Sequence, residues 1–278
     1  MPASTPTVSV VMSVHNGLPF VLEAVDSVLG QDYDDFELVV VDDGSTDGTF
    51  DALARCGDTR MLLVQRPHLG RVAALNHALG LARGCYVANL DADDVALHGR
   101  LALPVRFLDE HPEVAVVGAA VEPYVGPSAG RRPRRPRRLP RSDRAIRWSF
   151  LFRNPVFHSS ATFRAAALAE VGGYDPAYAE RHDADLLLRL GQRYQLANLD
   201  APLAAKRLHA GQHFAAVDRR RRLARHAACR RRAARELRFA PLLRPCAHLL
   251  ASVGTARSLV TIGMLGCNGG LRPRDRAQ

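Results

Sequence analysis

Apolar runs and helical segments alternate along the first 121 residues of the chain. The apolar runs are mostly β-branched and have no polar face, which is typical of strands buried on both sides of a sheet. Predicted strands cover residues 8–14, 36–41, 61–64, 85–88 and 114–121, and predicted helices cover 19–29, 46–55, 70–83 and 97–110. Ser45 or Thr46 is the expected cap of the second helix, and Gly84 the expected end of the third. The short connections predict parallel βαβ units and an α/β fold.

The pattern is less regular after residue 121. Residues 126–141 are rich in proline and arginine and contain no acid between Arg131 and Arg141, which predicts a mobile loop. From residue 217 onward the composition becomes strongly basic. Later elements are predicted at 146–152, 159–163 (a strand), 164–171 (a helix), 185–190 (a helix) and 219–238 (a helix), followed by a moderately apolar stretch at 242–265.

The net charge of +10 favours an anionic partner, such as nucleic acid, a phosphorylated substrate or a membrane surface. Lys206 is the single lysine, so this bias towards arginine reflects a GC-rich genome as much as selection for binding. The five cysteines are scattered and form no Cys-x-x-Cys, so neither a disulfide framework nor a zinc site is expected. The chain shows no signal-peptide pattern and no membrane-spanning apolar run, which together predict a cytoplasmic protein.

Three carboxylates, Asp91, Asp93 and Asp94, follow the predicted strand at 85–88. In open α/β sheets, ligands bind where strands end. Carboxylates this close repel one another and need a counter-charge, and Mg²⁺ or Mn²⁺ suits oxygen ligands. The alternative is an acidic turn that caps the next helix. No Gly-x-Gly-x-x-Gly follows the first strand, so a dinucleotide-binding fold is disfavoured.

The order and spacing of several motifs resemble glycosyltransferase family 2, which has the GT-A fold. The resemblance covers roughly residues 7–214 and implies a GT-A, Rossmann-like, mainly parallel mixed sheet flanked by helices. It also implies an inverting, hexosyltransferase-type enzyme that uses a nucleotide-diphosphate sugar and a divalent cation. The matching segments are VSVVMSVHNG, VDSVLGQDYDDFELVVVDDGSTDGT, GRVAALNHALGLARGCYVANLDADD, NPVFHSSATFR, VGGYD, HDADLLLRL and KRLHAGQ.

For the donor side, the resemblance implies that Asp43 binds the nucleotide base and that Asp91 meets the ribose or the metal's water shell. Arg71 matches a position that contacts the nucleotide, and Ser13 and His15 lie where the base is expected. The family usually has Tyr at the place of His15. Asp43 could instead form an Asx-turn or a helix cap, a role that suits its neighbour Asp42 better.

For catalysis, the resemblance implies that Asp93 binds the metal, that His209 approaches the metal or diphosphate, and that Asp183 is the general base. His182 departs from the family, because Glu is usual there. Asp185 is a second candidate for the base, although helical geometry turns it to another face. Asp94 is expected to cap the following helix, and His158 receives no chemical role.

These matches predict a glycosyltransferase domain over 1–216, with a nucleotide-sugar half at 1–121 and an acceptor half at 146–216. The tail at 217–278 is either a basic helix on an anionic membrane surface, holding the enzyme at the inner face of the cell membrane, or a solvated helix. The expected partners are a UDP-sugar and a saccharide or lipid-linked acceptor for cell-surface polysaccharide or glycolipid synthesis, with no nucleic acid. The alternatives are a non-catalytic nucleotide-sugar-binding member of the family and an arginine-rich nucleic-acid-binding protein.

Overall fold

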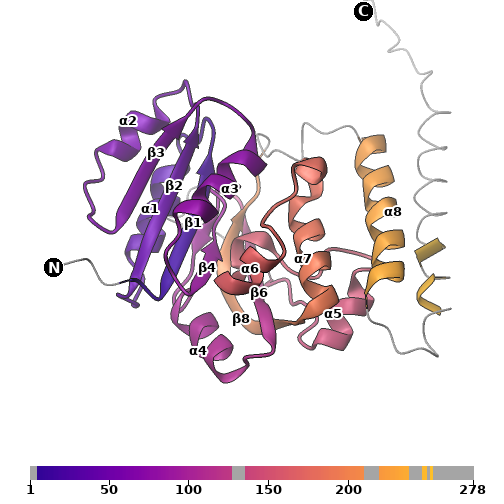
Figure 1. Cartoon of the computed structure of the whole chain (residues 1–278). Helices are drawn as coiled ribbons and strands as arrows, with labels where there is room; N and C mark the ends of the chain where they lie inside the picture. The colour runs from indigo at the N-terminus through magenta and orange to yellow at the C-terminus, as the bar shows by residue number, and fades with distance from the viewer. Residues whose placement is uncertain (1–4, 127–134, 210–218, 238–245, 249–250, 253–278) are drawn as a thin grey trace, which may run out of the picture.

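The computed structural model describes residues 5–126, 135–209, 219–237, 246–248 and 251–252, which form one eight-stranded sheet with helices on both faces (Figure 1). The strands are β1 (Val8–Val14), β2 (Phe36–Asp43), β3 (Met61–Arg66), β4 (Tyr86–Asn89), β5 (Val95–Ala96), β6 (Val114–Tyr124), β7 (Thr162–Arg164) and β8 (Gln195–Arg207). The α-helices are α1 (Val21–Leu29), α2 (Thr49–Ala54), α3 (Arg71–Leu81), α4 (Ala102–Glu110), α5 (Asp143–Ser149), α6 (Ala165–Glu170), α7 (His182–Arg193) and α8 (Arg219–Glu236), and the 3-10 helices are η1 (His158–Ser160) and η2 (Pro176–Arg181). The strands follow the order β3-β2-β1-β4-β7-β6-β8-β5 across the sheet, so the predicted α/β class is confirmed.

The sheet separates two apolar cores, and successive side chains of β1 enter them alternately. Val10 and Met12 pack in the core shared with α1 and α4, whereas Val11 packs in the core shared with α3 and α7. Both faces of the strand are therefore buried, as its unbroken apolar run predicts.

The first four strands form the parallel part of the sheet. β1 pairs in parallel with β2 and β4, and β2 pairs in parallel with β3, which confirms the predicted βαβ units. The start of α2 was predicted wrongly. This helix begins after Gly48, whose φ is +87°, while Ser45 and Thr46 hydrogen-bond with Asn16 instead.

Gly84 has a different role from the predicted helix end. Helix α3 already ends at Leu81, and its C-cap is Ala82. A Cβ at Gly84 would lie only 2.5 Å from the backbone N of Ser9, so glycine is required because the chain passes close to β1 on its way into β4.

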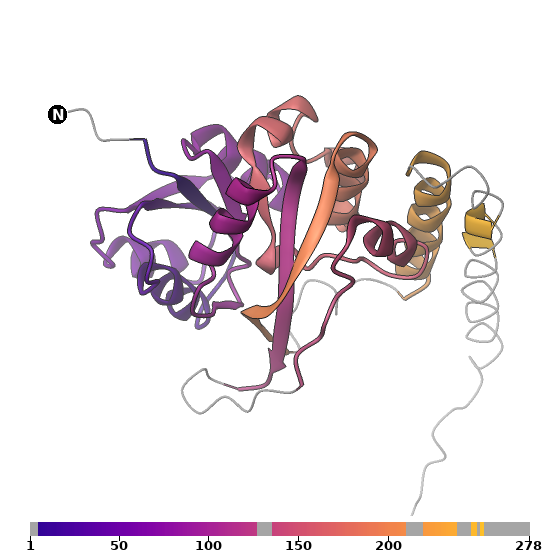
Figure 2. The ribbon, with the colours of Figure 1, turned by 90° about the horizontal axis from the view of Figure 1, so that it is seen from below.

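The rest of the sheet is mixed. β7 runs antiparallel to both β4 and β6, while β6 and β8 run parallel to each other and lie side by side through the centre of Figure 2. β5 and β8 had no sequence-based prediction. The acidic turn, Asp91–Asp94, is followed directly by β5. Residues Ala204 and Ala205 of β8 pair with β5, so the end of β8, which contains the last matching segment, lies beside this turn.

Helix α8 lies beside α7 (Figure 1). Its residues Ala233, Ala234 and Leu237 (just past its end) are buried in the same core as α7. The arginine-rich helix predicted in the tail therefore exists, and one of its faces packs on the sheet domain. The domain boundary near 217 stays a prediction. Most of the loop at 126–141 and of the apolar stretch at 242–265 lies outside the described residues.

None of the helices within the described residues combines the length and the apolar character needed to cross a membrane.

Candidate active site

The predicted donor-side residues gather where β1, β2 and β4 end at one edge of the sheet. His15 follows β1, Asp43 ends β2, and Asp91 lies two residues beyond β4. Because these strands are parallel and adjacent, their carboxyl ends converge on one place. Ser13 is half-buried in β1 beside Val41 of β2.

Asp43 is almost fully buried and already accepts hydrogen bonds from the chain. Its carboxylate accepts from the backbone N–H groups of Leu69 and Gly70, each at 2.9 Å, and lies 2.9 Å from His68 Nδ1. A carboxylate offers about four acceptor positions, so capacity for a nucleobase N–H is left. The neighbouring Asp42 accepts a hydrogen bond from the Ser45 N–H at 2.8 Å, which confirms its predicted Asx-turn role.

Two histidines stack at this edge of the sheet. The rings of His15 and His68 have centroids 4.1 Å apart, and the Nδ1 atom of each lies 2.9 Å from the carbonyl oxygen of Asp43. A carbonyl only accepts, so both Nδ1 atoms carry a proton. His68 had no predicted role, and nothing in the apolar pattern marks it, because it lies in the loop between β3 and α3.

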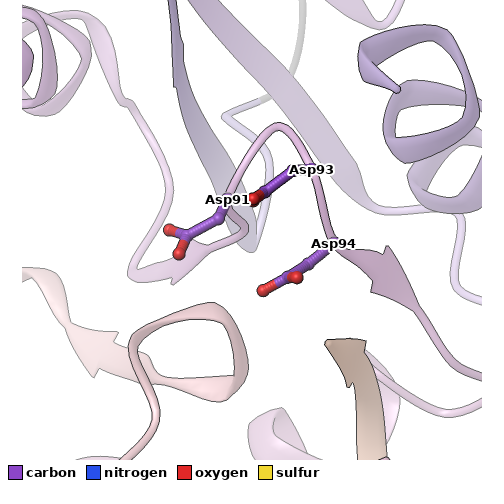
Figure 3. A group of neighbouring side chains, drawn as sticks. All are labelled: Asp91, Asp93 and Asp94. Atoms are coloured by element: carbon purple, nitrogen blue, oxygen red, sulfur yellow. The ribbon is translucent and has the colours of Figure 1, made fainter. Parts of the chain in front are cut away.

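The acidic turn forms a compact group of oxygen ligands (Figure 3). Ligand atoms of Asp91, Asp93 and Asp94 all lie within 4.8 Å of one another. His209 Nε2 lies 3.0 Å from Asp93 Oδ2, so β8 brings the predicted imidazole to the predicted metal ligand. Two half-buried carboxylates beside an imidazole suit a hard divalent cation, so the residues fit the group that the motif implies.

Arg71, at the start of α3, forms an ion pair with Asp91. Burial would raise the pKa of the Asp91 carboxyl, but the Arg71 guanidinium and the His158 ring outweigh burial and hold this pKa well below its usual range. Asp91 is therefore an anion at neutral pH. The structure thus brings together Arg71 and Asp91, two of the predicted nucleotide-sugar ligands.

Asp94 does not cap the following helix as predicted, because α4 begins only after Leu101. Its buried carboxylate accepts hydrogen bonds from Ser159 Oγ at 2.5 Å and from the backbone N–H of Arg207 at 3.0 Å. Lys206 Nζ lies 3.5 Å away. Burial raises the pKa of Asp94 to about 7 even with Lys206 nearby. Through these hydrogen bonds, Asp94 connects the acidic turn to Ser159 of η1 and to Arg207 of β8.

Asp183, the predicted general base, lies in the first turn of α7. Its Oδ2 accepts a hydrogen bond from Asn154 Nδ2 at 2.6 Å, and its Oδ1 lies 2.7 Å from the backbone N of Ala184. Burial raises the pKa of the Asp183 carboxyl, but the neighbouring His182, then Arg181 and His158, and the N–H of Ala184 together outweigh burial and lower it.

Asp185, the second candidate for the base, is held differently. Its side chain is only 1% exposed and forms ion pairs with both Arg189 and Arg232. It therefore faces the packing between α7 and α8, as helical geometry predicts.

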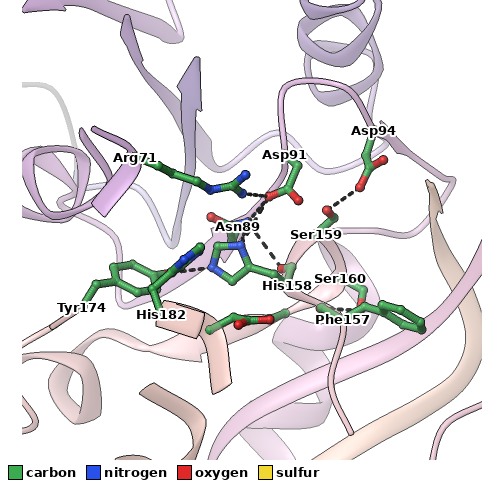
Figure 4. A network of polar contacts seen from close by, with 12 residues as sticks. Arg71, Asn89, Asp91, Asp94, Phe157, His158, Ser159, Ser160, Tyr174 and His182 are labelled. Carbon is green, nitrogen blue, oxygen red and sulfur yellow. Dashed lines mark hydrogen bonds and ion pairs between the residues drawn. The ribbon is translucent and has the colours of Figure 1, made fainter. Parts of the chain in front are cut away.

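His158 connects the acidic turn to the start of α7 (Figure 4). Its Nδ1 lies 3.3 Å from Asp91 Oδ1, and its Nε2 lies 2.8 Å from the Tyr174 hydroxyl. Burial raises the pKa of the Tyr174 hydroxyl; Arg71 lowers it, and the carboxylates of Asp91 and Asp183 add to the increase. Sequence reasoning gave His158 no role, although it stands in the matching segment NPVFHSSATFR.

His182, the departure from the family, packs against this connection. Its ring centroid lies 5.2 Å from that of His158 and 5.6 Å from that of Tyr174. Nδ1 donates a hydrogen bond to the carbonyl oxygen of Ala179 at 3.0 Å, whereas the buried Nε2 has no hydrogen-bond partner among the described residues. Burial lowers the pKa of His182 to about 4, so the ring is neutral.

A mixed α/β sheet with an acidic turn at its carboxyl edge defines the class of GT-A transferases. The mannosyltransferase PcManGT from Pyrobaculum calidifontis has the same fold, with a TM-score of 0.64, 23% sequence identity, and coverage of 97% of this chain and 78% of that protein. The sequence pattern of the family "Glycosyl transferase family 2" matches residues 9–171, more than half of the chain, so this chain belongs to that family.

Two curated relatives carry glycosyltransferase names. The putative glycosyltransferase EpsE of Bacillus subtilis is 37% identical over 122 residues, which are 42% of this chain and 44% of EpsE. WfaP of Escherichia coli, named a UDP-Glc:alpha-D-GlcNAc-diphosphoundecaprenol beta-1,3-glucosyltransferase, is 31% identical over 103 residues, which are 37% of this chain and 41% of WfaP. The chain thus spans less than half the length of each of these two relatives.

Proposed function

We propose that this protein transfers a sugar from a nucleotide-diphosphate sugar, a UDP-sugar, to an acceptor hydroxyl with inversion at the anomeric carbon. We further propose that the product belongs to a cell-surface polysaccharide or glycolipid.

The observation that carries the proposal is the gathering of side chains from separate segments. Arg71 pairs with Asp91, and Asp93 lies 3.0 Å from His209. His158 hydrogen-bonds with Tyr174, lies 3.3 Å from Asp91 and packs against His182, the neighbour of Asp183. In an inverting transfer the diphosphate leaves from one side of the anomeric carbon while the acceptor hydroxyl attacks from the other. The diphosphate needs positive charge or a cation beside it, and the hydroxyl needs a carboxylate base.

A divalent cation would be held by Asp93 and His209, with Asp91 meeting its water shell or the ribose. When bound, such a cation stabilises negative charge on the departing diphosphate as a Lewis acid. The fit rests on the half-buried carboxylates of the acidic turn and on the imidazole that β8 brings to them.

Asp183 acts as the general base. The acceptor oxygen attacks the anomeric carbon, the bond from that carbon to the diphosphate oxygen breaks with its electron pair on the diphosphate, and the hydroxyl proton passes to the Asp183 carboxylate. The lowered pKa of Asp183 keeps the carboxylate ionised at neutral pH, and Asn154 holds one of its oxygens in place. Asp185 is unsuited to this role, because two arginines occupy its carboxylate.

The nucleotide lies against the ends of β1 and β2. Asp43 accepts an N–H of the base, and Ser13 and His15 line the same edge. The imidazole stack of His15 on His68 supplies a flat face for the base, in place of the tyrosine that the family usually has. The name of WfaP supports a UDP-sugar donor and a lipid-linked acceptor for this chain.

A thermal-shift screen tests the donor assignment. We expect UDP-sugars to raise the melting temperature in the presence of Mn²⁺ or Mg²⁺, because a ligand that binds the native state stabilises it. GDP- and dTDP-sugars serve as comparisons and should raise it less. Asp93→Ala should lose both this shift and sugar transfer, since the diphosphate loses its cation. Full transfer by Asp93→Ala, or by the wild type in EDTA, would contradict the proposal.

A further inference from the structure

A cavity is lined by residues of η2, α7 and α8. It encloses about 340 Å³, a volume in the range that binds small ligands. We call it the arginine pocket. Its lining residues are Ala177, Tyr178, Arg181, Asp185, Leu188, Ala228, Cys229, Arg232 and Arg235.

The arginine pocket has an excess of positive charge. Arg181, Arg232 and Arg235 line it, and Asp185 is the one carboxylate among its lining residues. Asp185 is buried and neutralised by its two ion pairs, so it presents little negative charge to a ligand. An anion is therefore the ligand that this lining favours.

Arg232 is held in a fixed position on the pocket wall. Its guanidinium pairs with Asp185 and Glu236 and lies over the ring of Tyr178, 5.0 Å from the ring centroid. Because Arg232 already pairs with two carboxylates, it shapes the pocket wall, and the excess positive charge offered to a phosphate group comes from Arg181 and Arg235. The half-exposed ring of Tyr178 adds an apolar face beside these charges.

The arginine pocket lies close to the proposed base. Arg181 stands two residues before Asp183 and is the N-cap residue of α7. Cys229 lines the pocket together with Arg181; burial and the charge of Asp183 raise the pKa of its thiol, whereas Arg181 and Arg232 lower it.

We propose that the arginine pocket binds a phosphate or diphosphate group carried by the acceptor. The anionic end of a glycosyl diphosphate then lies against α8, while a hydroxyl of its sugar lies at Asp183. This inference rests on the proposed function, because it names the acceptor class of the same active site. The donor diphosphate is assigned to the acidic turn, which is a separate set of residues.

Direct binding of undecyl diphosphate and of inorganic pyrophosphate, measured by isothermal titration calorimetry in EDTA, tests the proposal. EDTA removes the cation on which the donor site depends, so the measurement reports the arginine pocket. We expect both probes to bind, undecyl maltoside not to bind, and affinity to fall with added salt. Arg235→Glu should weaken binding by about tenfold, because a partly exposed attractive charge becomes a repulsive one.

Arg231→Glu is the matched control. Arg231 is an exposed arginine of the same helix that does not line the pocket, so its reversal makes the same change in net charge. We expect its affinity to stay within about twofold of the wild type, since charges separated by water are largely screened. Arg235→Gln should give an intermediate loss, and circular dichroism checks that each variant is folded.

If undecyl diphosphate binds more tightly than pyrophosphate, the pocket recognises the diphosphate of a lipid-linked acceptor. If the two bind equally, the pocket recognises the diphosphate group alone. The proposal is overturned if neither probe binds, if the two charge reversals weaken binding equally, or if an oligonucleotide binds more tightly than undecyl diphosphate and loses affinity in Arg235→Glu. Failure of the donor thermal shift would refute the proposed function and leave this result unchanged, because the titration needs neither metal nor donor.

Discussion

The proposed donor and acceptor sides of the site differ in how their charged groups are arranged. On the donor side, each of two carboxylates has a partner from a distant segment: Asp43 accepts hydrogen bonds from the amides of Leu69 and Gly70, and Asp91 pairs with Arg71 at the start of α3. On the acceptor side, three arginines line a pocket with one neutralised carboxylate, and His182 Nε2 lies buried without a partner among the described residues.

The difference follows from how each side is built. Donor-side residues stand at the ends of adjacent parallel strands, so the sheet register itself brings them together. Acceptor-side residues stand on α7, η2 and α8, which meet through side-chain packing. Substitutions on α8 can therefore alter the acceptor side while the sheet and the donor side stay intact.

The largest effect that separates the two sides is expected from Asp183→Asn. The amide keeps the shape of the carboxylate but cannot accept the proton, and general-base catalysis contributes about 10²–10⁴-fold. We expect turnover to fall by that factor while the donor-induced thermal shift stays unchanged. Steady-state transfer assays and thermal shift on the same preparation provide the measurement.

Asp185→Asn is the control for Asp183→Asn. It removes the charge that two partly buried arginines share, so it should lower stability and leave turnover of the folded protein close to that of the wild type. If Asp185→Asn abolished turnover with donor binding intact, the base would have to be moved two residues along α7.

A smaller effect, on stability alone, is expected from Leu237→Ala. The Leu237 side chain is buried against Gly191 of α7, and removing it leaves a cavity between α7 and the end of α8. A buried Leu→Ala substitution lowers the free energy of unfolding by about 2–4 kcal/mol. Urea denaturation measures the change, with Arg231→Ala as the exposed control on α8. An unchanged midpoint for Leu237→Ala would indicate that α8 contributes nothing to the stability of the sheet domain.

The parallel part of the sheet could be predicted from sequence because its strands are unbroken apolar runs and their ends carry the motif residues. The mixed part could not. β5 has two residues, too few for any period to show, and β8 mixes small, polar and proline residues instead of β-branched ones. Its partners also lie far away in the chain.

The candidate site shows the same division. Asp91, Asp93, His209, Arg71 and Asp183 could be placed by the family motifs. The role of Asp94 could not, because its partners Ser159 and Arg207 are 65 and 113 residues away in sequence. The arginine pocket was equally hidden, since it exists only where α8 packs on α7.

The smallest effect concerns His182 and the pH dependence of stability. In the unfolded chain this ring titrates near its ordinary value of 6.5, whereas burial lowers its pKa to about 4 in the folded protein. Between these values the unfolded chain binds the proton first, so the free energy of unfolding falls as the pH drops from 6.5 towards 4, and no effect is expected above 6.5. At pH 5 the loss should be about 1–2 kcal/mol.

Urea denaturation at pH 7 and pH 5 should show a smaller drop in the free energy of unfolding for His182→Gln, which cannot titrate, than for the wild type. His98→Gln, at a side chain that is 88% exposed, should keep the full drop. The same drop in His182→Gln as in the wild type would show that the ring on the acceptor side does not sit in the folded protein as a neutral, buried group.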